Sequence, residues 1–304
     1  MGAPQYDSTD RAAKLMLVVL SLAWGITWPA MRIALRELPP FSMRTVSLGL
    51  GALVLLIVVA LQRRGFALAR PVDWLHVVIS MLLNIVGFTM LSAFALLMTA
   101  TSRVTILSYT MPIWAAVLAR FVLGERLTRA ALAALALCAV GIAILIWPLA
   151  QNGIPTGLLL ALAIGVTWAA GTVYVKWAQI KSDPITFAAW QLTTGFVLVA
   201  IGLRFVEGTP HFADAHAPAW LATIFTGVVG SGLAYFLWFK IIGRLPAMTA
   251  SLGLLSVPPI GVVATALILG ERPTLPDMIG FALIFAAAAC VLLPAREPAP
   301  PEPS

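Results

Sequence analysis

Charged side chains are scarce in this sequence. Only 10% of the 304 residues are Asp, Glu, Lys or Arg, whereas 61% are hydrophobic. A soluble globular domain carries about 25% charged residues. The chain therefore lacks the polar residues that a water-soluble fold of this size needs on its surface, and the composition predicts a protein embedded in lipid.

Histidine and cysteine are also rare, with three and two copies. Cys138 and Cys290 fall inside apolar runs, so we interpret them as small core residues and not as a disulfide or metal pair. Without a buried Ser–His pair, a carboxylate pair or a metal cluster, an intramembrane enzyme has little support. A GxxxxGK[ST] loop is missing too, which excludes an ATP-driven pump. We expect no enzymatic activity, no cofactor, no metal and no nucleic-acid partner.

Long apolar runs are what the sequence has in abundance. A helix crosses the hydrocarbon core of a bilayer with about 20 residues. Period-two alternation is absent, which favours a helical bundle over a barrel. We predict an all-α integral membrane protein with ten transmembrane helices, at roughly 14–35, 41–62, 74–98, 101–123, 129–148, 156–178, 184–204, 217–240, 247–269 and 275–293. The tails, about 1–13 and the Pro-rich 294–304, are predicted to be disordered.

The positive charges are distributed unevenly over the predicted loops. Of the 19 Lys and Arg residues, thirteen fall on the side of the N-terminus and six on the other. The positive-inside rule then places both termini in the cytoplasm. We therefore expect a multi-pass protein of the inner membrane, and the net charge of +7 needs no nucleic acid to explain it.

One motif occurs twice: residues 122–128 are VLGERLT and residues 268–274 are ILGERPT, at an offset of 146. The same offset relates Pro112 to Pro258, and an offset of 144 relates Trp24 to Trp168. We predict two five-helix repeats, 1–150 and 151–304. Because five is odd, the second copy enters the membrane from the opposite side, which is typical of transporters that work by alternating access.

With these phased motifs, the chain resembles the EamA family of the drug/metabolite transporter superfamily over about residues 14–293. Its size and aromatic content are similar to those of aromatic amino acid exporters of the YddG type. The resemblance implies cytoplasmic termini and a secondary transporter that exports small metabolites, with aromatic or neutral amino acids as the first candidates. A broad drug or metabolite exporter and a non-transporting receptor or scaffold remain as alternatives. The oligomeric state stays open, and a monomer is compatible with the sequence.

The acidic residues bear on energy coupling. All twelve lie in a loop, a tail or a span end, whereas ion-driven pumps usually carry an acid near the membrane midplane. We therefore expect facilitated transport through an uncharged central cavity, without coupling to a buried carboxylate. A strongly cationic substrate is disfavoured for the same reason.

The candidate site residues are neutral, polar or aromatic positions near the middle of the spans, where rings can stack on a substrate and amides and hydroxyls can fix its polar head. Such residues also form interfacial belts and interhelical contacts, which is the alternative for each of them. The predicted substrate-binding residues are Trp24, Trp28, Asn84, Phe88, Tyr109, Trp168, Thr172, Tyr235, Ser251 and Ser256.

Pro112 and Pro258 are predicted hinges, because a mid-helix proline removes a backbone hydrogen bond and bends the helix. Arg32, Lys176, Arg103 and Lys240 lie near span ends and are expected to reach the headgroups. Arg44, in the second span, is a further residue to test. The fifth and tenth spans are rich in alanine, so we expect them at the periphery, outside the transport path.

Overall fold

The computed structural model describes residues 11–125, 127, 129–149, 155–209, 212–242, 244 and 254–292. Within these ranges all regular secondary structure is helical. Residues 11–13, which were predicted to belong to the N-terminal tail, are the first turn of α1. The rest of that tail and the tail from residue 294 lie outside the described residues.

Seven helical segments are long and apolar enough to cross a membrane, and they match seven of the predicted spans. They are Arg11–Ala34 (α1), Pro40–Leu61 (α2), Asp73–Met98, Thr101–Val122, Thr156–Ala178 (α8), Pro184–Val206 (α9) and Ala217–Ile241. Three shorter apolar stretches lie in α7 (Arg129–Ile146), α13 (Val257–Leu269) and α14 (Leu275–Leu292). Two single 3₁₀ turns, Trp147–Leu149 and Phe212–Asp214, complete the described elements.

Local sequence explains where these helices begin and end. Prolines stand in the first turn of α2 and α9, where a missing N–H costs no intrahelical hydrogen bond. Asp183 caps α9 by accepting hydrogen bonds from the backbone N–H groups of Ile185 and Thr186. Gly270 follows α13 with a φ of 70°, a left-handed conformation that glycine adopts without strain. The GER turn is thus a helix C-cap in the second copy.

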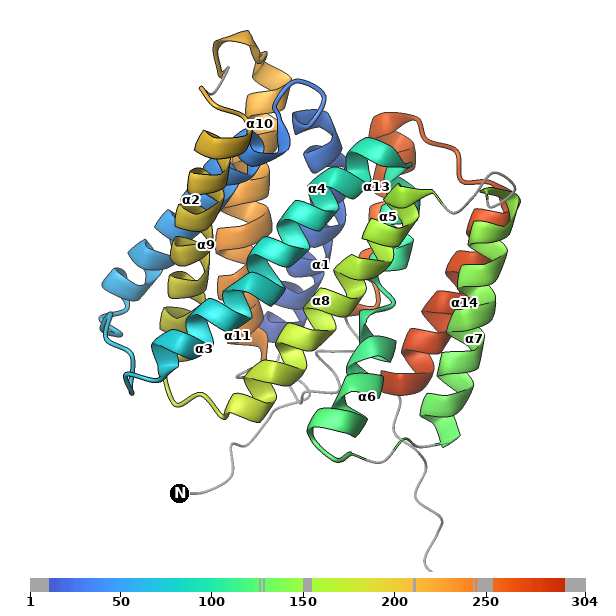
Figure 1. The fold of residues 1–304 in the computed structure, drawn as a ribbon, viewed down its shortest axis with the longest axis horizontal. Helices are drawn as coiled ribbons and strands as arrows, with labels where there is room; N and C mark the ends of the chain where they lie inside the picture. Colours follow the sequence, from blue (N-terminus) through green and yellow to red (C-terminus); the bar gives the residue numbers. More distant parts are fainter. Residues whose placement is uncertain are drawn as a thin grey trace, which may run out of the picture.

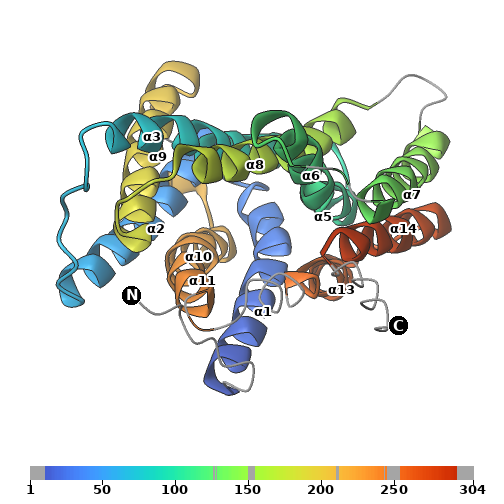
Figure 2. The same ribbon diagram turned by 90° about the horizontal axis from the view of Figure 1, so that it is seen from below.

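The helices form one bundle with two peripheral pairs (Figures 1 and 2). α7 packs along α14 at one end of the molecule, and α2 packs along α9 towards the other. Glycines allow the α7–α14 contact to be close, because a Cβ on Gly141 would lie 3.0 Å from the carbonyl oxygen of Gly280. The peripheral place of these two alanine-rich helices agrees with the prediction.

Two spans are interrupted just before a proline. α5 (Thr101–Ser108) and α6 (Met111–Val122) are separated by a turn at residues 109–110, and Pro112 stands in the first turn of α6. A turn at 255–256 likewise precedes α13, with Pro258 in its first turn. The sequence predicted that Pro112 and Pro258 each bend a continuous helix by removing a backbone hydrogen bond. The structure corrects this expectation. Each proline starts a new helix and leaves no donor missing.

Two other spans contain π-helical segments. Met81–Gly87 (η1) joins α3 (Asp73–Ser80) to α4 (Phe88–Met98), and Thr226–Leu233 (η4) joins α10 (Ala217–Phe225) to α11 (Ala234–Ile242). Residues 81–87 and 227–233 are related by the same offset of 146 as the prolines. π-Helical turns interrupt regular hydrogen bonding and are frequent at functional sites. Both of these segments border the same cavity.

Candidate functional site

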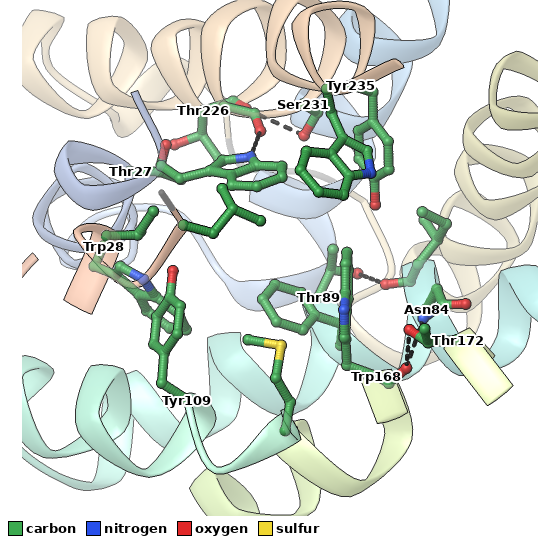
Figure 3. Close-up of a pocket in the computed structure, with 18 of the residues that line it drawn as sticks. Thr27, Trp28, Asn84, Thr89, Tyr109, Trp168, Thr172, Thr226, Ser231 and Tyr235 are labelled. Carbon is green, nitrogen blue, oxygen red and sulfur yellow. Dashed lines mark hydrogen bonds between the residues drawn. The ribbon is translucent and has the colours of Figure 1, made fainter. Parts of the chain in front are cut away.

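A central cavity of about 390 Å³ lies among the interrupted helices and the π-helical segments (Figure 3). Helices α1, α2, α4, α6, α8, α9 and α11 contribute to its wall, together with η1, η4, Tyr109 in the turn before α6, and Leu254, Leu255 and Val257. The lining residues are Trp24, Thr27, Trp28, Met31, Arg44, Leu48, Asn84, Ile85, Phe88, Thr89, Tyr109, Met111, Pro112, Ala115, Trp168, Ala169, Thr172, Leu192, Thr226, Gly230, Ser231, Tyr235, Trp238, Leu254, Leu255 and Val257.

Aromatic rings cross the cavity wall in a row. The ring centroids of Trp28 and Phe88 are 6.1 Å apart, and those of Phe88 and Trp168 are 5.0 Å apart with an edge-to-face geometry. A second pair, Trp24 and Trp238, has centroids 6.3 Å apart. Such rings offer flat apolar faces to a ligand and lose little conformational entropy when they bind it. The wall therefore suits a small molecule with an apolar or aromatic body.

Hydrogen bonds between helices fix the polar side of this wall. The Nδ2 of Asn84 donates to the carbonyl oxygen of Trp168 at 3.0 Å, and within α8 the hydroxyl of Thr172 donates to the same oxygen at 2.9 Å. Between α1 and η4, the indole N–H of Trp24 donates to the carbonyl oxygen of Gly230 at 3.1 Å. Asn84 thus forms the interhelical hydrogen bond considered above and also lines the cavity.

Two close contacts between helices beside the cavity each combine a glycine with a larger side chain. A Cβ on Gly171 would lie 2.1 Å from the Oδ1 of Asn84, and a Cβ on Gly230 would lie 2.6 Å from the hydroxyl oxygen of Thr27. By the offsets of 144 and 146, Thr27 corresponds to Gly171 and Asn84 to Gly230. Each contact therefore pairs one glycine with one larger polar residue. Both larger residues, Thr27 on α1 and Asn84 on η1, precede residue 150, and both glycines follow it.

The structure brings together eight of the ten predicted substrate-binding residues. Figure 3 shows Trp28 and Tyr109 on one side of the cavity, and Trp168, Asn84 and Thr172 on the other. Trp24, Phe88 and Tyr235 complete this group, and the predicted hinge Pro112 also lines the cavity.

The remaining candidates lie elsewhere. Ser256, in the turn before α13, is exposed and is not in the cavity lining, because the turn directs that position away from it. Pro258 borders a separate, small cavity of about 20 Å³ against α14. Ser251 lies outside the described residues.

The prediction of an uncharged cavity is wrong, because Arg44 is part of the wall and is 3% exposed. It stands in the second turn of α2, and the sequence does not show which face of that helix points inward. Met31 was also missed. Its signal was helical spacing, since Trp24, Thr27, Trp28 and Met31 follow each other at intervals that share one face of a helix.

The cavity is closed beside α5. Seven of the eight residues of this helix are buried, and its inner hydroxyls bond back to the helix, Thr105 to the carbonyl of Thr101 and Ser108 to that of Val104. α13 packs on it closely, with a Cβ on Gly261 only 3.0 Å from Thr105. Thr172, which lines the cavity from α8, is by contrast exposed.

Charged groups hold the N-terminal end of α5. The carboxylate of Glu271, in the loop after α13, accepts hydrogen bonds from the backbone N–H groups of Thr101 and Ser102 at 3.0 and 3.1 Å. Partial burial opposes ionisation of Glu271, but these hydrogen bonds outweigh it and lower the pKa below its ordinary value of 4.5. Arg103 does not extend to the headgroups as expected. It forms a bidentate ion pair with the buried Asp277 of α14, at 2.7 and 3.1 Å.

A bundle of apolar helices with a closed-ended cavity at interrupted segments is typical of secondary transporters. The comparison with protein families agrees. The EamA-like transporter family matches residues 11–147 and again 155–293. The chain therefore belongs to the EamA-like transporter family, and its apolar helices are those of a multi-pass membrane protein.

Two curated relatives are similar to this chain over about nine-tenths of their length. The chain is 30% identical to the uncharacterized transporter YvbV of Bacillus subtilis, covering 91% of this chain and 90% of that protein. It is 26% identical to a probable amino-acid metabolite efflux pump of Escherichia coli, over 90% and 92% of the two chains. A solved crystal structure of a protein at 21% identity has a TM-score of 0.64 and covers 92% of this chain and 95% of its own, which shows a shared fold.

Proposed function

We propose that this protein exports small metabolites, first of all amino acids with apolar or aromatic side chains, across the inner membrane by alternating access. The observation that carries the proposal is the aromatic row Trp28–Phe88–Trp168 in the wall of the central cavity. Its volume of about 390 Å³ falls at the small end of ligand cavities, which suits a molecule of amino-acid size. The name of the Escherichia coli relative supports the same substrate class.

The architecture behind this mechanism is a ten-helix bundle of two inverted five-helix repeats, 1–150 and 151–304. Two successive family matches of similar length support it, as do the interruptions before Pro112 and Pro258 and the π-helical segments at one common offset. Inverted repeats can exchange conformations, so that a cavity between them opens to one side and then to the other.

The loop charges support an orientation with both termini in the cytoplasm. The end of the cavity beside α5 and Glu271 then faces the non-cytoplasmic side, because the chain enters α1 and α5 from opposite faces of the bundle (Figure 1). On this proposal, the packing of α5 against α13 closes the cavity towards the outside. Export requires the packing of α5 against α13 to open during each cycle.

Uptake into proteoliposomes tests the proposal. Purified protein is reconstituted, and radiolabelled phenylalanine is exchanged against unlabelled phenylalanine, leucine, glutamate and lysine on the inside. We expect exchange above that of empty vesicles with the first two and little with lysine. Vesicles that exchange no amino acid faster than protein-free controls would rule out the amino-acid assignment. Inhibition by unrelated hydrophobic drugs at similar concentrations would favour the broad exporter.

Transport is expected to proceed without a proton gradient. Among the residues that the structure describes, none of those lining the cavity is acidic, so the wall offers no carboxylate to bind a coupling ion. Efflux of preloaded phenylalanine should change less than twofold when a protonophore collapses the gradient. If the protonophore instead slows this efflux more than tenfold, a group other than a carboxylate in the cavity wall carries the coupling proton.

Removal of the Glu271 carboxylate should favour opening beside α5. Glu271→Ala leaves two N–H groups of α5 without their charged acceptor, which costs about 1–2 kcal/mol, a roughly 5- to 30-fold change in population. The readout is labelling of Thr105→Cys by a membrane-impermeant thiol reagent, with Cys138 and Cys290 replaced by alanine. The cap contributes fully above pH 4.5 and is lost as the pH falls below that value through the lowered pKa of Glu271.

Glu207→Ala is the matched control for this experiment. Glu207 caps α2 in the same way, accepting from the backbone N–H groups of Phe41 and Ser42 at 2.7 and 2.8 Å, but it does not touch α5. Its removal should leave the labelling rate unchanged. Equal acceleration by both variants would mean that general loosening, and not the α5 closure, is being measured.

A further inference from the structure

Arg44 is a buried cation in the wall of the cavity. It is 3% exposed, although it lies on a helix of high hydropathy. Its Nη2 donates to the hydroxyl of Ser92 at 2.7 Å and contacts the sulfur of Met31 at 2.9 Å. Its Nε is buried and has no hydrogen-bond acceptor. The guanidinium is therefore only partly satisfied by the protein.

The described part of the chain supplies no counter-ion for this charge. Its ion pairs involve other cations, namely Arg64, Arg70, Arg103, Lys176 and His216. The two carboxylates near the start of α2 are engaged elsewhere, Glu207 with the backbone of Phe41 and Ser42, and Glu37 with His216. An uncompensated buried charge costs several kcal/mol, so such a residue within a membrane span marks a ligand or ion pathway.

The shape of the group indicates which ligand would compensate it. A guanidinium presents its N–H donors as a planar fork that matches a carboxylate, and the resulting charge-assisted hydrogen bonds are about twice as strong as neutral ones. Ser92 occupies one donor of Nη2, and Nε has no acceptor in the wall of a cavity that also holds aromatic rings. A molecule with a carboxylate at one end and an apolar body would satisfy both parts of the wall.

An ammonium group finds no such partner. Among the residues that the structure describes around the cavity, none is Asp or Glu, and a cation would meet only hydroxyls, amides and ring faces. A cation near Arg44 is also repelled by it. The cavity thus discriminates between the two charged groups of an amino acid, whose carboxylate is bound and whose ammonium is merely tolerated.

We propose, as a refinement that rests on the transport function above, that Arg44 binds the carboxylate of the substrate. The cavity accordingly takes apolar monocarboxylates, with or without an amino group, and rejects the corresponding amines. Arg44 is then the residue that determines specificity for an anionic group, and the aromatic row holds the apolar body.

Four probes that share a phenyl ring test this assignment: 3-phenylpropionate, phenylalanine, 2-phenylethylamine and the neutral 2-phenylethanol. Binding to the purified full-length protein is measured by quenching of tryptophan fluorescence, and transport is measured separately in proteoliposomes. For the wild type we expect the two carboxylates to bind at least tenfold more tightly than the amine. Arg44→Gln should weaken both carboxylates about 10- to 100-fold, as expected for lost charge-assisted hydrogen bonds, and change the neutral probe less than threefold.

Two further variants separate a binding role from a structural one. Arg44→Lys keeps the charge but loses the fork, so it should retain part of the preference for carboxylates. Arg32→Gln is the matched control, because Arg32 donates to the carbonyl oxygen of Leu96 and does not line the cavity. It should leave the preference unchanged in protein that elutes as a single species.

The outcomes distinguish this assignment from the transport function. A wild type that binds the amine as tightly as the carboxylates, or an Arg44→Gln variant that weakens all four probes equally, overturns the role of Arg44. Carboxylate binding that depends on Arg44 without any transport would overturn the transport function and leave the anion site standing. If Arg44→Gln leaves the transport of phenylalanine unchanged, the role of Arg44 is overturned and the transport function stands.

Discussion

Trp168→Ala is expected to lower kcat/KM for phenylalanine exchange by about 30- to 100-fold, which corresponds to roughly 2–3 kcal/mol of lost ring contact and stacking. The ring of Trp168 packs edge-to-face on Phe88, and its carbonyl accepts from Asn84 and Thr172. The substitution removes the ring and leaves these backbone contacts in place. Binding should therefore suffer much more than folding, as measured by exchange rates and by the elution profile of the purified variant.

Trp147→Ala is the control for this prediction. Trp147 is 79% exposed beyond the end of α7 and has no part in the cavity wall. Its loss removes a ring of equal size from the outer surface, so exchange should remain within twofold of the wild type. If the two variants behave alike, or if Trp168→Ala exchanges phenylalanine normally, the aromatic row does not contact the substrate.

Asp277→Ala is expected to reduce the free energy of unfolding by about 3–5 kcal/mol, because it leaves the half-buried guanidinium of Arg103 without its partner. The carboxylate also accepts from the backbone N–H and the hydroxyl of Thr274 at 2.9 and 2.8 Å, so the start of α14 loses one half of its capping box as well. Unfolding is followed by circular dichroism in mild detergent with increasing SDS.

The exposed ion pair of Glu125 and Lys176 gives the matched contrast. Their side chains are 49% and 64% exposed, and such surface pairs contribute about 0–1 kcal/mol. Glu125→Ala should therefore shift the unfolding midpoint only slightly. In the double variant Arg103→Met with Asp277→Leu, no stranded charge remains, and most of the loss should be recovered. A double variant as unstable as Asp277→Ala would show that the cost lies in packing and not in the charge.

Much of the candidate site was accessible from the sequence. The spans could be located because backbone groups in lipid must be paired within helices, which forces long apolar runs. Trp24 and Trp168 were found through their shared register in the two halves, and Asn84 because an unpaired amide in lipid is costly. The interruptions near Pro112 and Pro258 were located too, although their form was not.

Arg44 and Arg103 show what the sequence could not predict, namely the environment of a single arginine near a span end. Both are single arginines near a span end, and both were compatible with a side chain extended to the headgroups. In the structure one lines the cavity and the other is paired with Asp277. The difference arises from the neighbouring helices, which present a hydroxyl to the first and a carboxylate to the second.

The sequence by itself thus predicted which segments are apolar enough to cross the membrane, where two of them break, and most of the neutral side chains that the structure brings together at the cavity. Hydropathy and the internal offset carry this information because they act along the chain. Only the tertiary structure decided which face of each helix meets the cavity and whether a charge there is paired. Those properties depend on contacts between helices far apart in sequence, such as α2 with α4 and α5 with α14.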